Sequence, residues 1–440
     1  MNCRAYLAIG LTGLATVSAW AQPPAKGTRA LKLPEGVTID QLSEPKEAAR
    51  IADIMDKEYP EPKSEATRML IAILRGSQLD GRDGWFGPAQ SRYSWNWLAK
   101  RNGLEIKSGE AKGPGETRPG APKPGDLKQG DVRPADSKPM GLARDKFKGS
   151  LEIFDQLDRD GDGNITASDL DWSPSNPYVM QANIISRVFR RMETSGNGKL
   201  TRAELDEFFQ SVAKDKDHIT ADDLRRAMIP RGGAGFSPGD APSTGVLVKG
   251  LFAGEIGSMG EGPKPGEKAP GFALKTPDGK ETISLSSLTG TKPVVLILGN
   301  FTCGPFRSLY PDVDAVYRRH KDKANFLMVY VREAHPKDGW KMDSNARMGV
   351  SVDQPKNYGE RVEVCELFRK KLEPGMPVVV DDLSDPVGTA YSGMPARLYV
   401  IDAKGNVAYK SGRGPFGFKP GEMEQALLMS LLEAQTPSIP

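Results

Sequence analysis

Hydrophobic positions recur with different periods along the chain, and the period separates its parts. Between Ile51 and Leu74, apolar residues recur at three- and four-residue spacing, which predicts a small α-helical unit within residues 22–104. Between residues 263 and 435, short β-rich runs alternate with longer helical stretches, which predicts an α/β fold. The β-rich runs are Val294 to Leu298, Phe326 to Val331, Val378 to Val380 and Leu398 to Ile401.

Two segments rich in proline and glycine interrupt this pattern. Residues 105–146 hold few large apolar side chains, so they cannot bury enough surface to offset the entropy of ordering, and we predict a disordered linker. Residues 230–262 begin with a similar stretch, Pro230 to Thr244, and are predicted to be a second linker. The chain is therefore expected to be multidomain, with a middle unit at residues 147–229.

An aromatic stretch, Gly84 to Trp97, lies at the end of the N-terminal helical unit. These side chains have two readings, a stacking platform for a ligand or the packing of a small unit. Packing is favoured, because clustered aromatic side chains mostly serve hydrophobic cores.

The middle unit contains a segment, Asp158 to Asp169, with the spacing of an EF-hand calcium loop. Such a loop needs oxygen donors at its first, third, fifth, seventh, ninth and twelfth positions and glycine at its sixth. Gly163 is at the turn, and Ile165 fits the short strand that pairs with a partner loop. The donors are Asp158, Asp160, Asp162, Asn164 through its carbonyl, Thr166 and Asp169. We therefore predict Ca²⁺ as the cofactor, with Asp169 in place of the usual Glu weakening affinity or admitting magnesium.

A second, degraded loop follows, as expected because EF-hands usually occur in pairs. Its ligand positions are Glu193, Ser195, Asn197, Lys199, Thr201 and Glu204, around Gly198. Leu200 corresponds to Ile165 of the first loop. Because Glu193 is longer than aspartate and crowds the first position, metal binding at this loop is left open. Together the two loops predict an α-helical EF-hand pair.

The N-terminus has the pattern of a cleaved secretory signal. Arg4 precedes an apolar run from Ala5 to Val17 and the small-residue tripeptide Ala19-Trp20-Ala21, so residues 1–21 are predicted to be a signal peptide. The run is shorter than the about 20 residues that span a bilayer. We therefore expect a periplasmic or secreted protein without a stable membrane span. The formal net charge of +3, spread over the whole length, argues against nucleic acid as a partner.

Signal cleavage removes Cys3 and leaves two cysteines, Cys303 and Cys365. Cys303 lies between an apolar strand and a helix, where the helix N-terminus stabilises a thiolate, so it is a candidate nucleophile. Phe306 replaces the second cysteine of a Cys-x-x-Cys motif, so a resolving thiol is Cys365 or an external one. One bridge, a reactive pair and two unrelated thiols all remain open. Met394-Pro395 lies where thioredoxin-like folds place a cis-proline.

Four motifs make residues 263–435 resemble the iodothyronine deiodinases. They are Gly299 to Phe306, Val329 to Trp340, Ala390-Tyr391 through Arg397 to Ile401, and Gly412 to Phe416. The resemblance implies a thioredoxin-like α/β domain with cysteine at the position of the family's selenocysteine. It further implies that Cys303 is the nucleophile and that Glu333 and His335 are its proton and hydrogen-bond partners. Arg397 would be an active-site cation, and Cys365 would take part in regenerating the nucleophile.

The chain also departs from this family. Sulfur replaces selenium, which slows attack on carbon-bound iodine, because a thiol is largely protonated near neutral pH. A second active-site histidine is missing, since His335 is the last histidine in the chain. Two hypotheses follow. The protein is a thiol-dependent oxidoreductase served by a small thiol or protein reductant, or it is a non-catalytic, calcium-dependent binding or scaffold protein with a retired redox fold.

Overall fold

The computed structural model describes residues 31–59, 63–77, 87–104, 140–228, 240–257 and 260–435. The predicted signal peptide, residues 1–21, and most of the first predicted linker lie outside these ranges. Among the described residues, no helix has both the length and the apolar character needed to cross a membrane.

An eight-stranded sheet forms the centre of the molecule, in the order β1-β10-β9-β6-β7-β8-β4-β5. β6 (Val294–Gly299), β7 (Asn325–Tyr330) and β8 (Val378–Val380) run parallel to one another. β9 (Arg397–Ile401) is antiparallel to β6, and β10 (Val407–Lys410) is antiparallel to β9. The strands predicted from the β-rich runs are thus confirmed. Every residue of β6 is buried, because a continuous apolar run suits a strand covered on both faces.

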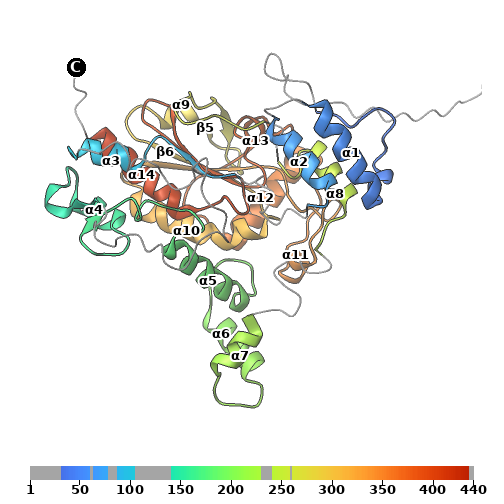
Figure 1. Ribbon diagram of the computed structural model, residues 1–440, viewed down its shortest axis with the longest axis horizontal. Helices are drawn as coiled ribbons and strands as arrows, with labels where there is room; N and C mark the ends of the chain where they lie inside the picture. The colour runs from blue at the N-terminus through green and yellow to red at the C-terminus, as the bar shows by residue number, and fades with distance from the viewer. Residues whose placement is uncertain are drawn as a thin grey trace, which may run out of the picture.

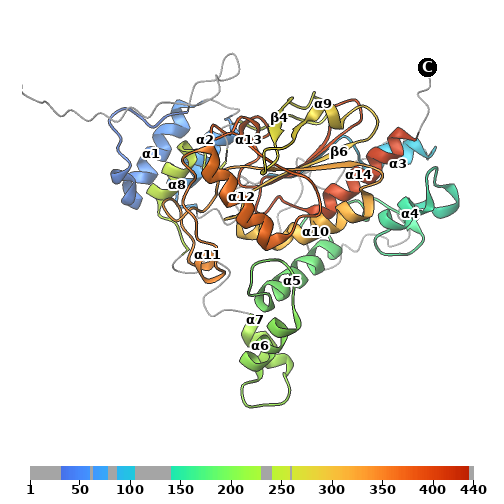
Figure 2. The same cartoon turned by 180° about the vertical axis from the view of Figure 1, so that it is seen from behind.

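Three helices, α10 (Gly304–His320), α12 (Tyr358–Leu372) and α14 (Pro420–Ala434), lie together along one side of this sheet (Figures 1 and 2). α10 connects β6 to the parallel β7, and α14 follows the β9–β10 hairpin. This connectivity and strand order are thioredoxin-like, which confirms the predicted fold of the C-terminal domain. The smaller elements are β4 (Ala273–Lys275), β5 (Thr282–Ser284), α9 (Leu285–Leu288), α11 (Asp343–Arg347) and α13 (Pro386–Ala390).

The N-terminal residues are divided between two hydrophobic cores and do not form the single small unit predicted at residues 22–104. α1 (Pro45–Glu58) and α2 (Glu65–Leu74) build a second core at one end of the molecule (Figure 1). β1 (Gln90–Ser91) instead pairs with β10, and α3 (Trp95–Arg101) follows it into the main core. The aromatic stretch serves this packing, as predicted: the rings of Tyr93 and Trp97 meet edge to face at 4.8 Å. A short 3-10 helix precedes α1 at Asp40–Ser43.

A helix, α8 (Thr244–Phe252), occupies part of the second predicted linker. Its Leu247, Val248 and Leu251 are fully buried against α1 and α2. The linker prediction for residues 230–262 is therefore wrong over α8, because three apolar side chains on one face offset the entropy of ordering the segment. The first predicted linker also ends earlier than residue 146, since β2 (Leu142–Ala143) is folded.

The two candidate calcium loops do not pair with each other, which corrects the predicted EF-hand pair. In the first loop, β3 (Asn164–Ile165) pairs with β2, so the partner of Ile165 is Leu142. The preceding helix, α4 (Leu151–Leu157), buries Ile153 and Phe154 in the main core and packs against α14. The first loop is thus part of the sheet domain.

The second loop belongs to a separate group of helices. It connects α5 (Pro177–Met192) to α6 (Arg202–Ala213), and α7 (Ala221–Met228) follows. Figures 1 and 2 show these three helices projecting from the face of the sheet domain that carries α10. Leu200, the counterpart of Ile165, is not part of a strand. Two EF-hand-like loops in the sequence therefore do not form a pair in the structure, because the strand of the first loop, β3, pairs with β2 earlier in the chain.

Candidate active site and cation-binding loops

Cys303 lies where β6 gives way to α10, as its sequence position predicted. It is the residue that caps the N-terminus of α10, and its side chain is buried with 1% exposed. The end of β6 and the start of α10 therefore fix the position of the thiol at the carboxyl-terminal end of a central strand. Both cysteines in the described residues, Cys303 and Cys365, are free.

The buried side chain of Asn300 holds the loop that carries Cys303. Its Oδ1 accepts hydrogen bonds from the backbone N–H groups of Cys303 at 3.0 Å and Ala334 at 3.3 Å. Its Nδ2 donates to the carbonyl of Pro395 at 2.8 Å. The Met394–Pro395 peptide bond is cis, at the position that the sequence indicated. Asn300 thus ties together three separate segments around the thiol, a role that the sequence analysis missed.

Glu333 is fully buried and binds the residue before Cys303. Its Oε2 accepts the backbone N–H of Thr302 at 2.8 Å, and its Oε1 accepts the hydroxyl of Tyr330. Burial raises the pKa of this carboxyl, although both hydrogen bonds oppose the rise. Because both oxygens already have partners, the arrangement suits Glu333 to hold the loop.

His335 contacts the same residue, Thr302, through its backbone. Its N–H donates to the Thr302 hydroxyl at 2.9 Å, and its ring meets the edge of Trp340 at 4.5 Å. The ring Nδ1 lies 3.2 Å from the carbonyl of Trp340, which can only accept, so Nδ1 carries the proton. Burial lowers the pKa of His335 to about 4. At neutral pH the ring is therefore neutral, and Nε2 is a proton acceptor.

The Cys303 thiol is not the preformed thiolate that its place at a helix N-terminus predicted. Burial raises its pKa to about 11. The Phe306 backbone and the positive charge of Arg307 lower the pKa, and the charge of Glu333 raises it further. The pKa is raised because burial destabilises the thiolate, by removing it from water, more than the helix N-terminus stabilises it.

Arg307 is the cation beside Cys303, and the sequence analysis did not identify it. It is fully buried, one helical turn after Cys303. One guanidinium nitrogen, Nη1, donates to the carbonyl of Phe301, and Nη2 donates to Oδ1 of Asn345 at 2.8 Å. Asn345 in turn donates to the carbonyl of Thr302 at 2.7 Å. The spacing of four residues on a helix was the available signal for this contact.

Arg397, predicted as the active-site cation, lies in a different cluster. In the described structure, the charged groups that act on the Cys303 thiol are Arg307 and Glu333. Arg397 is 3% exposed and donates to the carbonyl of Glu261 at 3.0 Å. Its role as an active-site cation stays a prediction. Arg397 shares its surroundings with two other buried cations, Lys410 and Arg413, whose pKa values burial lowers to about 8 and about 10.

Cys365 lies on α12, fully buried within the main core. Burial raises the pKa of its thiol well above the ordinary value, and the charge of Glu333 adds to the rise. Glu333 thus acts electrostatically on both thiols, although no bond joins Cys303 to Cys365.

The first candidate calcium loop gathers carboxylates. Oxygen atoms of Asp158, Asp160 and Asp162 all lie within 4.8 Å of one another. The Asp162 backbone N–H lowers the pKa of Asp160, but burial and the neighbouring carboxylates outweigh it and raise that pKa. Asp158 Oδ1 is buried without a hydrogen-bond partner, while Oδ2 accepts the N–H of Gly163 at 2.9 Å. An orphaned acceptor among repelling carboxylates fits a bound cation.

The remaining predicted ligands of this loop are organised differently. Asn164 lies in β3 and pairs through its backbone with Ala143. Asp169 accepts the N–H of Thr166 at 2.8 Å through Oδ2 and the N–H of Arg159 at 3.1 Å through Oδ1. The shorter carboxylate thus closes the loop through hydrogen bonds.

The second loop satisfies its acidic groups internally. Glu204 accepts the backbone N–H groups of Thr194 at 3.0 Å, Ser195 at 2.9 Å and Thr201 at 2.9 Å. Burial alone raises the pKa of Glu204, but these donors hold it at about 2.

Other residues at predicted ligand positions of the second loop also have partners. Glu193 accepts the Ser195 hydroxyl at 2.8 Å and the Asn197 N–H at 2.9 Å. Lys199 forms an ion pair of 2.9 Å with Glu373 of the sheet domain. Within the described ranges, only the first loop therefore brings three carboxylates together.

Known proteins resemble the C-terminal part of the chain. Residues 248–430 match the family description "Iodothyronine deiodinase". Thyroxine 5-deiodinase of Rattus norvegicus is 30% identical over 159 residues, which cover 36% of this chain and 51% of that protein. Thyroxine 5-deiodinase of Gallus gallus is 31% identical over 173 residues, which cover 39% and 65%. The predicted deiodinase-like character of this domain is thus confirmed, and the chain spans about half the length of the first curated relatives it matches.

Solved structures also align with this region. A putative thiol:disulfide interchange protein DsbE from Chlorobium tepidum is 22% identical and covers 38% of this chain and 99% of its own, with a TM-score of 0.28. A putative protein disulfide isomerase from Bacteroides thetaiotaomicron is 21% identical and covers 38% and 88%, with a TM-score of 0.28.

Proposed function

We propose that the protein is an exported, calcium-binding thiol oxidoreductase in which Cys303 of the deiodinase-like domain is the nucleophile. One observation carries the proposal: Glu333 and His335 both bind Thr302, the neighbour of Cys303 at the start of α10. Two titratable residues in different protonation environments are thereby held against the residue that precedes a free thiol. Export rests on residues 1–21, outside the described part of the chain.

The chemistry follows from the protonation states. Because burial keeps the Cys303 thiol protonated at neutral pH, attack needs a base that removes the proton as the new bond forms. Neutral His335, with its proton on Nδ1, offers Nε2 for this step. With a peroxide, a sulfur–oxygen bond forms, the O–O bond breaks, and the released alkoxide takes the proton. Two equivalents of an external thiol then restore Cys303, with release of water and of their disulfide. If Cys365 first condenses with the oxidised Cys303 and releases the water, the same two equivalents reduce the resulting Cys303–Cys365 disulfide.

The electrophile is soft, since a thiolate is the attacking group. Peroxides, disulfides and iodinated phenols all belong to this class. Iodinated phenols merit inclusion because the curated relatives are named thyroxine 5-deiodinase and type I iodothyronine deiodinase. In that case the sulfur takes the iodine, the ring carbon takes the proton, and a second thiol releases iodide.

Turnover of cumene hydroperoxide, a small disulfide and an iodinated phenol with dithiothreitol as reductant tests the activity. We expect Cys303→Ser to abolish turnover of whichever electrophile is used. Cys365→Ser is the matched control, because that thiol is equally buried, and it should keep single-turnover reactivity at Cys303. No activity on any of the three electrophiles, or equal activity of Cys303→Ser, would refute the oxidoreductase.

Calcium binding is proposed for the first loop, with Asp158, Asp160 and Asp162 as carboxylate ligands. The buried, unpartnered Oδ1 of Asp158 supports this choice. Calorimetric titration with Ca²⁺ is expected to give one site that Asp158→Asn removes. Glu193→Gln, at the same position of the second loop, should leave that site unchanged. Binding that survives Asp158→Asn and disappears with Glu193→Gln would reverse the assignment.

A second function, a non-catalytic calcium-dependent binding protein, is favoured by one observation. Cys303 and Cys365 are both buried with raised pKa values, as in cysteines that serve packing. Under this alternative, the first loop binds calcium while Cys303 reacts with none of the electrophiles. The pair of experiments above therefore separates the two functions.

A further inference from the structure

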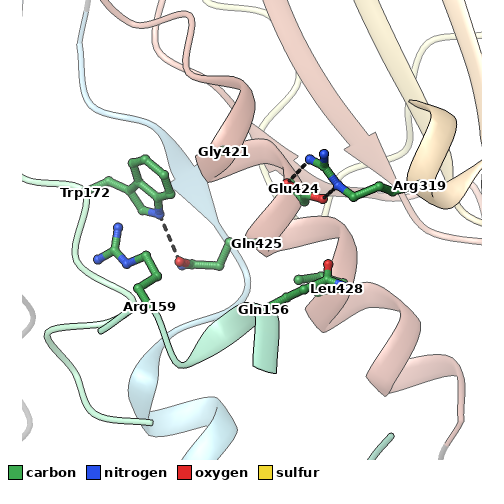
Figure 3. A pocket seen from close by; sticks show the side chains of 8 residues that line it. All are labelled: Gln156, Arg159, Trp172, Arg319, Gly421, Glu424, Gln425 and Leu428. Carbon is green, nitrogen blue, oxygen red and sulfur yellow. Dashed lines mark hydrogen bonds and ion pairs between the residues drawn. The ribbon is translucent and has the colours of Figure 1, made fainter. Parts of the chain in front are cut away.

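A cavity of about 210 Å³ lies between the segment that carries the first candidate calcium loop and helices α10 and α14. Figure 3 shows it between Arg159 and Trp172 on one side and Arg319 and Gln425 of α10 and α14 on the other. Arg319 lies in the last turn of α10, whereas Cys303 caps the first. The proposed thiol chemistry makes no use of the cavity.

Arg159 supplies the cavity with a cation whose donors are only partly used. Its guanidinium lies 4.7 Å from the ring centres of both Trp172 and Tyr178. Nη2 donates to the carbonyls of Ser168 and Asp171, each at 2.7 Å. The Nε and Nη1 atoms are buried without a hydrogen-bond partner. Buried donors are nearly always bonded, so two orphaned donors on one cation indicate a missing acceptor.

The other charged groups in the cavity are already paired. Arg319 makes two hydrogen bonds to Glu424, at 2.9 and 2.8 Å, and His320 lies 2.7 Å from the same carboxylate. Asp171 and Glu422 also act on Arg159 through their charges, and burial raises the pKa of Glu422. These acids offset part of the charge of Arg159, so a singly charged anion suits the cavity better than a doubly charged one.

An acceptor and an apolar wall complete the cavity. Gln156 Oε1 is buried without a hydrogen-bond partner, so a ligand with a hydrogen-bond donor would satisfy it. Trp172, whose Nε1 is bound by Gln425 at 2.9 Å, and Leu428 present carbon atoms. A volume of about 210 Å³ corresponds to roughly seven water molecules at about 30 Å³ each, which admits a ligand of few heavy atoms.

We propose that this cavity binds a small monocarboxylate that also carries a hydroxyl group, with Arg159 holding the carboxylate and Gln156 accepting from the hydroxyl. The carboxylate would accept hydrogen bonds from the unpartnered Nε and Nη1 of Arg159, and the hydroxyl would donate to the unpartnered Oε1 of Gln156. The site goes beyond the proposed thiol chemistry and is independent of it. Because Arg159 is the second residue of the first loop, the ligand binds against the segment that carries the candidate calcium ligands.

Lactate and propionate are the probes, since propionate has the same carbon chain without the hydroxyl. The indole N–H resonance of Trp172, assigned with Trp172→Phe, reports binding to the full-length chain by NMR in resin-treated, calcium-free buffer. We expect a saturable shift with lactate and at least fivefold weaker binding of propionate. Absence of saturation with both acids, equal binding of both, or preferential binding of inorganic phosphate overturns the proposal.

Variants test the two contacts separately. Arg159→Gln is expected to weaken lactate binding at least tenfold, whereas Arg144→Gln, an exposed arginine paired with Asp155 before the same loop, changes it less than twofold. Gln156→Leu keeps Arg159 in place and should bind lactate no better than propionate. Unchanged lactate binding in Arg159→Gln, or undiminished preference for lactate in Gln156→Leu, overturns the assignment even if one of the variants is destabilised.

Discussion

At the scale of single residues, Thr302 is the point where the candidate site converges. Glu333 binds its N–H, His335 binds its hydroxyl, and Asn345 binds its carbonyl. Each of these groups thereby acts on the position of Cys303, the next residue. Three hydrogen bonds thus hold the residue that precedes the thiol, and in the proposed chemistry the reaction of Cys303 depends on proton removal.

Arg307 offers a test of the electrostatics at Cys303. Its charge lowers the Cys303 pKa, so Arg307→Met is expected to raise that pKa and to slow alkylation by iodoacetamide above pH 8 at least threefold. Arg318→Met, an exposed arginine on the same helix, should leave the rate unchanged. The alkylation rate across pH, measured in a Cys365→Ser background, gives the comparison. A faster rate in Arg307→Met would contradict this role.

The position of Cys303 was predictable from its place between an apolar run and a helix, but its protonation state was not. Burial depends on side chains that lie far away in the sequence, and burial decides the pKa here. The family resemblance implied Arg397 as the active-site cation, and no sequence pattern pointed to Arg307, whose charge acts on the Cys303 thiol. The contacts of Asn300 join segments almost a hundred residues apart, and no local pattern reveals them.

At the scale of elements, the sequence predicted the strands that are continuous apolar runs and missed those that are short or partly exposed. β6 is buried throughout and was evident, whereas β4 exposes alternate positions and β5 has no buried residue. α8 was hidden within a glycine-rich segment. β3 was expected to pair with the second loop, but it pairs with β2, and such a choice between two short partners is made by tertiary packing.

α8 provides a test of the second hydrophobic core. Leu247→Ala is expected to lower the free energy of unfolding by about 2–5 kcal/mol, because a fully buried leucine leaves a cavity. Val246→Ala, at an exposed neighbouring position, should change it by less than about 0.5 kcal/mol. Urea denaturation measures both values. Equal values for the two variants would mean that α8 is not packed as described.

Glu204 gives the start of α6 a defined dependence on pH. Its folded pKa of about 2 lies below the ordinary value of 4.5, so its stabilising effect is present above pH 4.5 and is lost as the pH falls towards 2. The shift corresponds to about 3 kcal/mol at most. The difference in unfolding free energy between the wild type and Glu204→Gln should therefore shrink over this range.

A suitable control for that experiment is Glu207→Gln, which changes an exposed glutamate on the same helix. It should differ from the wild type by a small amount that does not vary with pH. A difference for Glu204→Gln that stays constant from pH 5 to pH 2 would show that the capping hydrogen bonds do not hold the carboxylate.

At the scale of the whole molecule, segments predicted as separate units are in contact. Arg413 of the sheet domain is fully buried and forms an ion pair of 3.0 Å with Glu65 at the start of α2. The second loop packs closely against α10, because a Cβ atom added at Gly198 would lie only 2.5 Å from Pro311. The N-terminal helices and the second loop therefore both touch the domain that carries Cys303.

The ion pair between Glu65 and Arg413 can be tested by removing one charge. Glu65→Gln is expected to lower the stability of the whole chain by about 2 kcal/mol, because the buried guanidinium loses its carboxylate. Glu47→Gln, which removes the partner of the exposed Arg50 in α1, should cost clearly less, because solvent screens that pair. Thermal unfolding reports both. A loss for Glu65→Gln no larger than that for Glu47→Gln would contradict the coupling of the two parts.

The nucleophilic role of Cys303 is tested most directly by its reaction with one equivalent of hydroperoxide at pH 7, followed by mass spectrometry in the Cys365→Ser background. We expect Cys303 to be oxidised faster than a free cysteine peptide, and His335→Gln to slow the reaction at least about tenfold, because the base is lost. A Cys303 that reacts no faster than the peptide, or that reacts equally well in His335→Gln, would contradict that role.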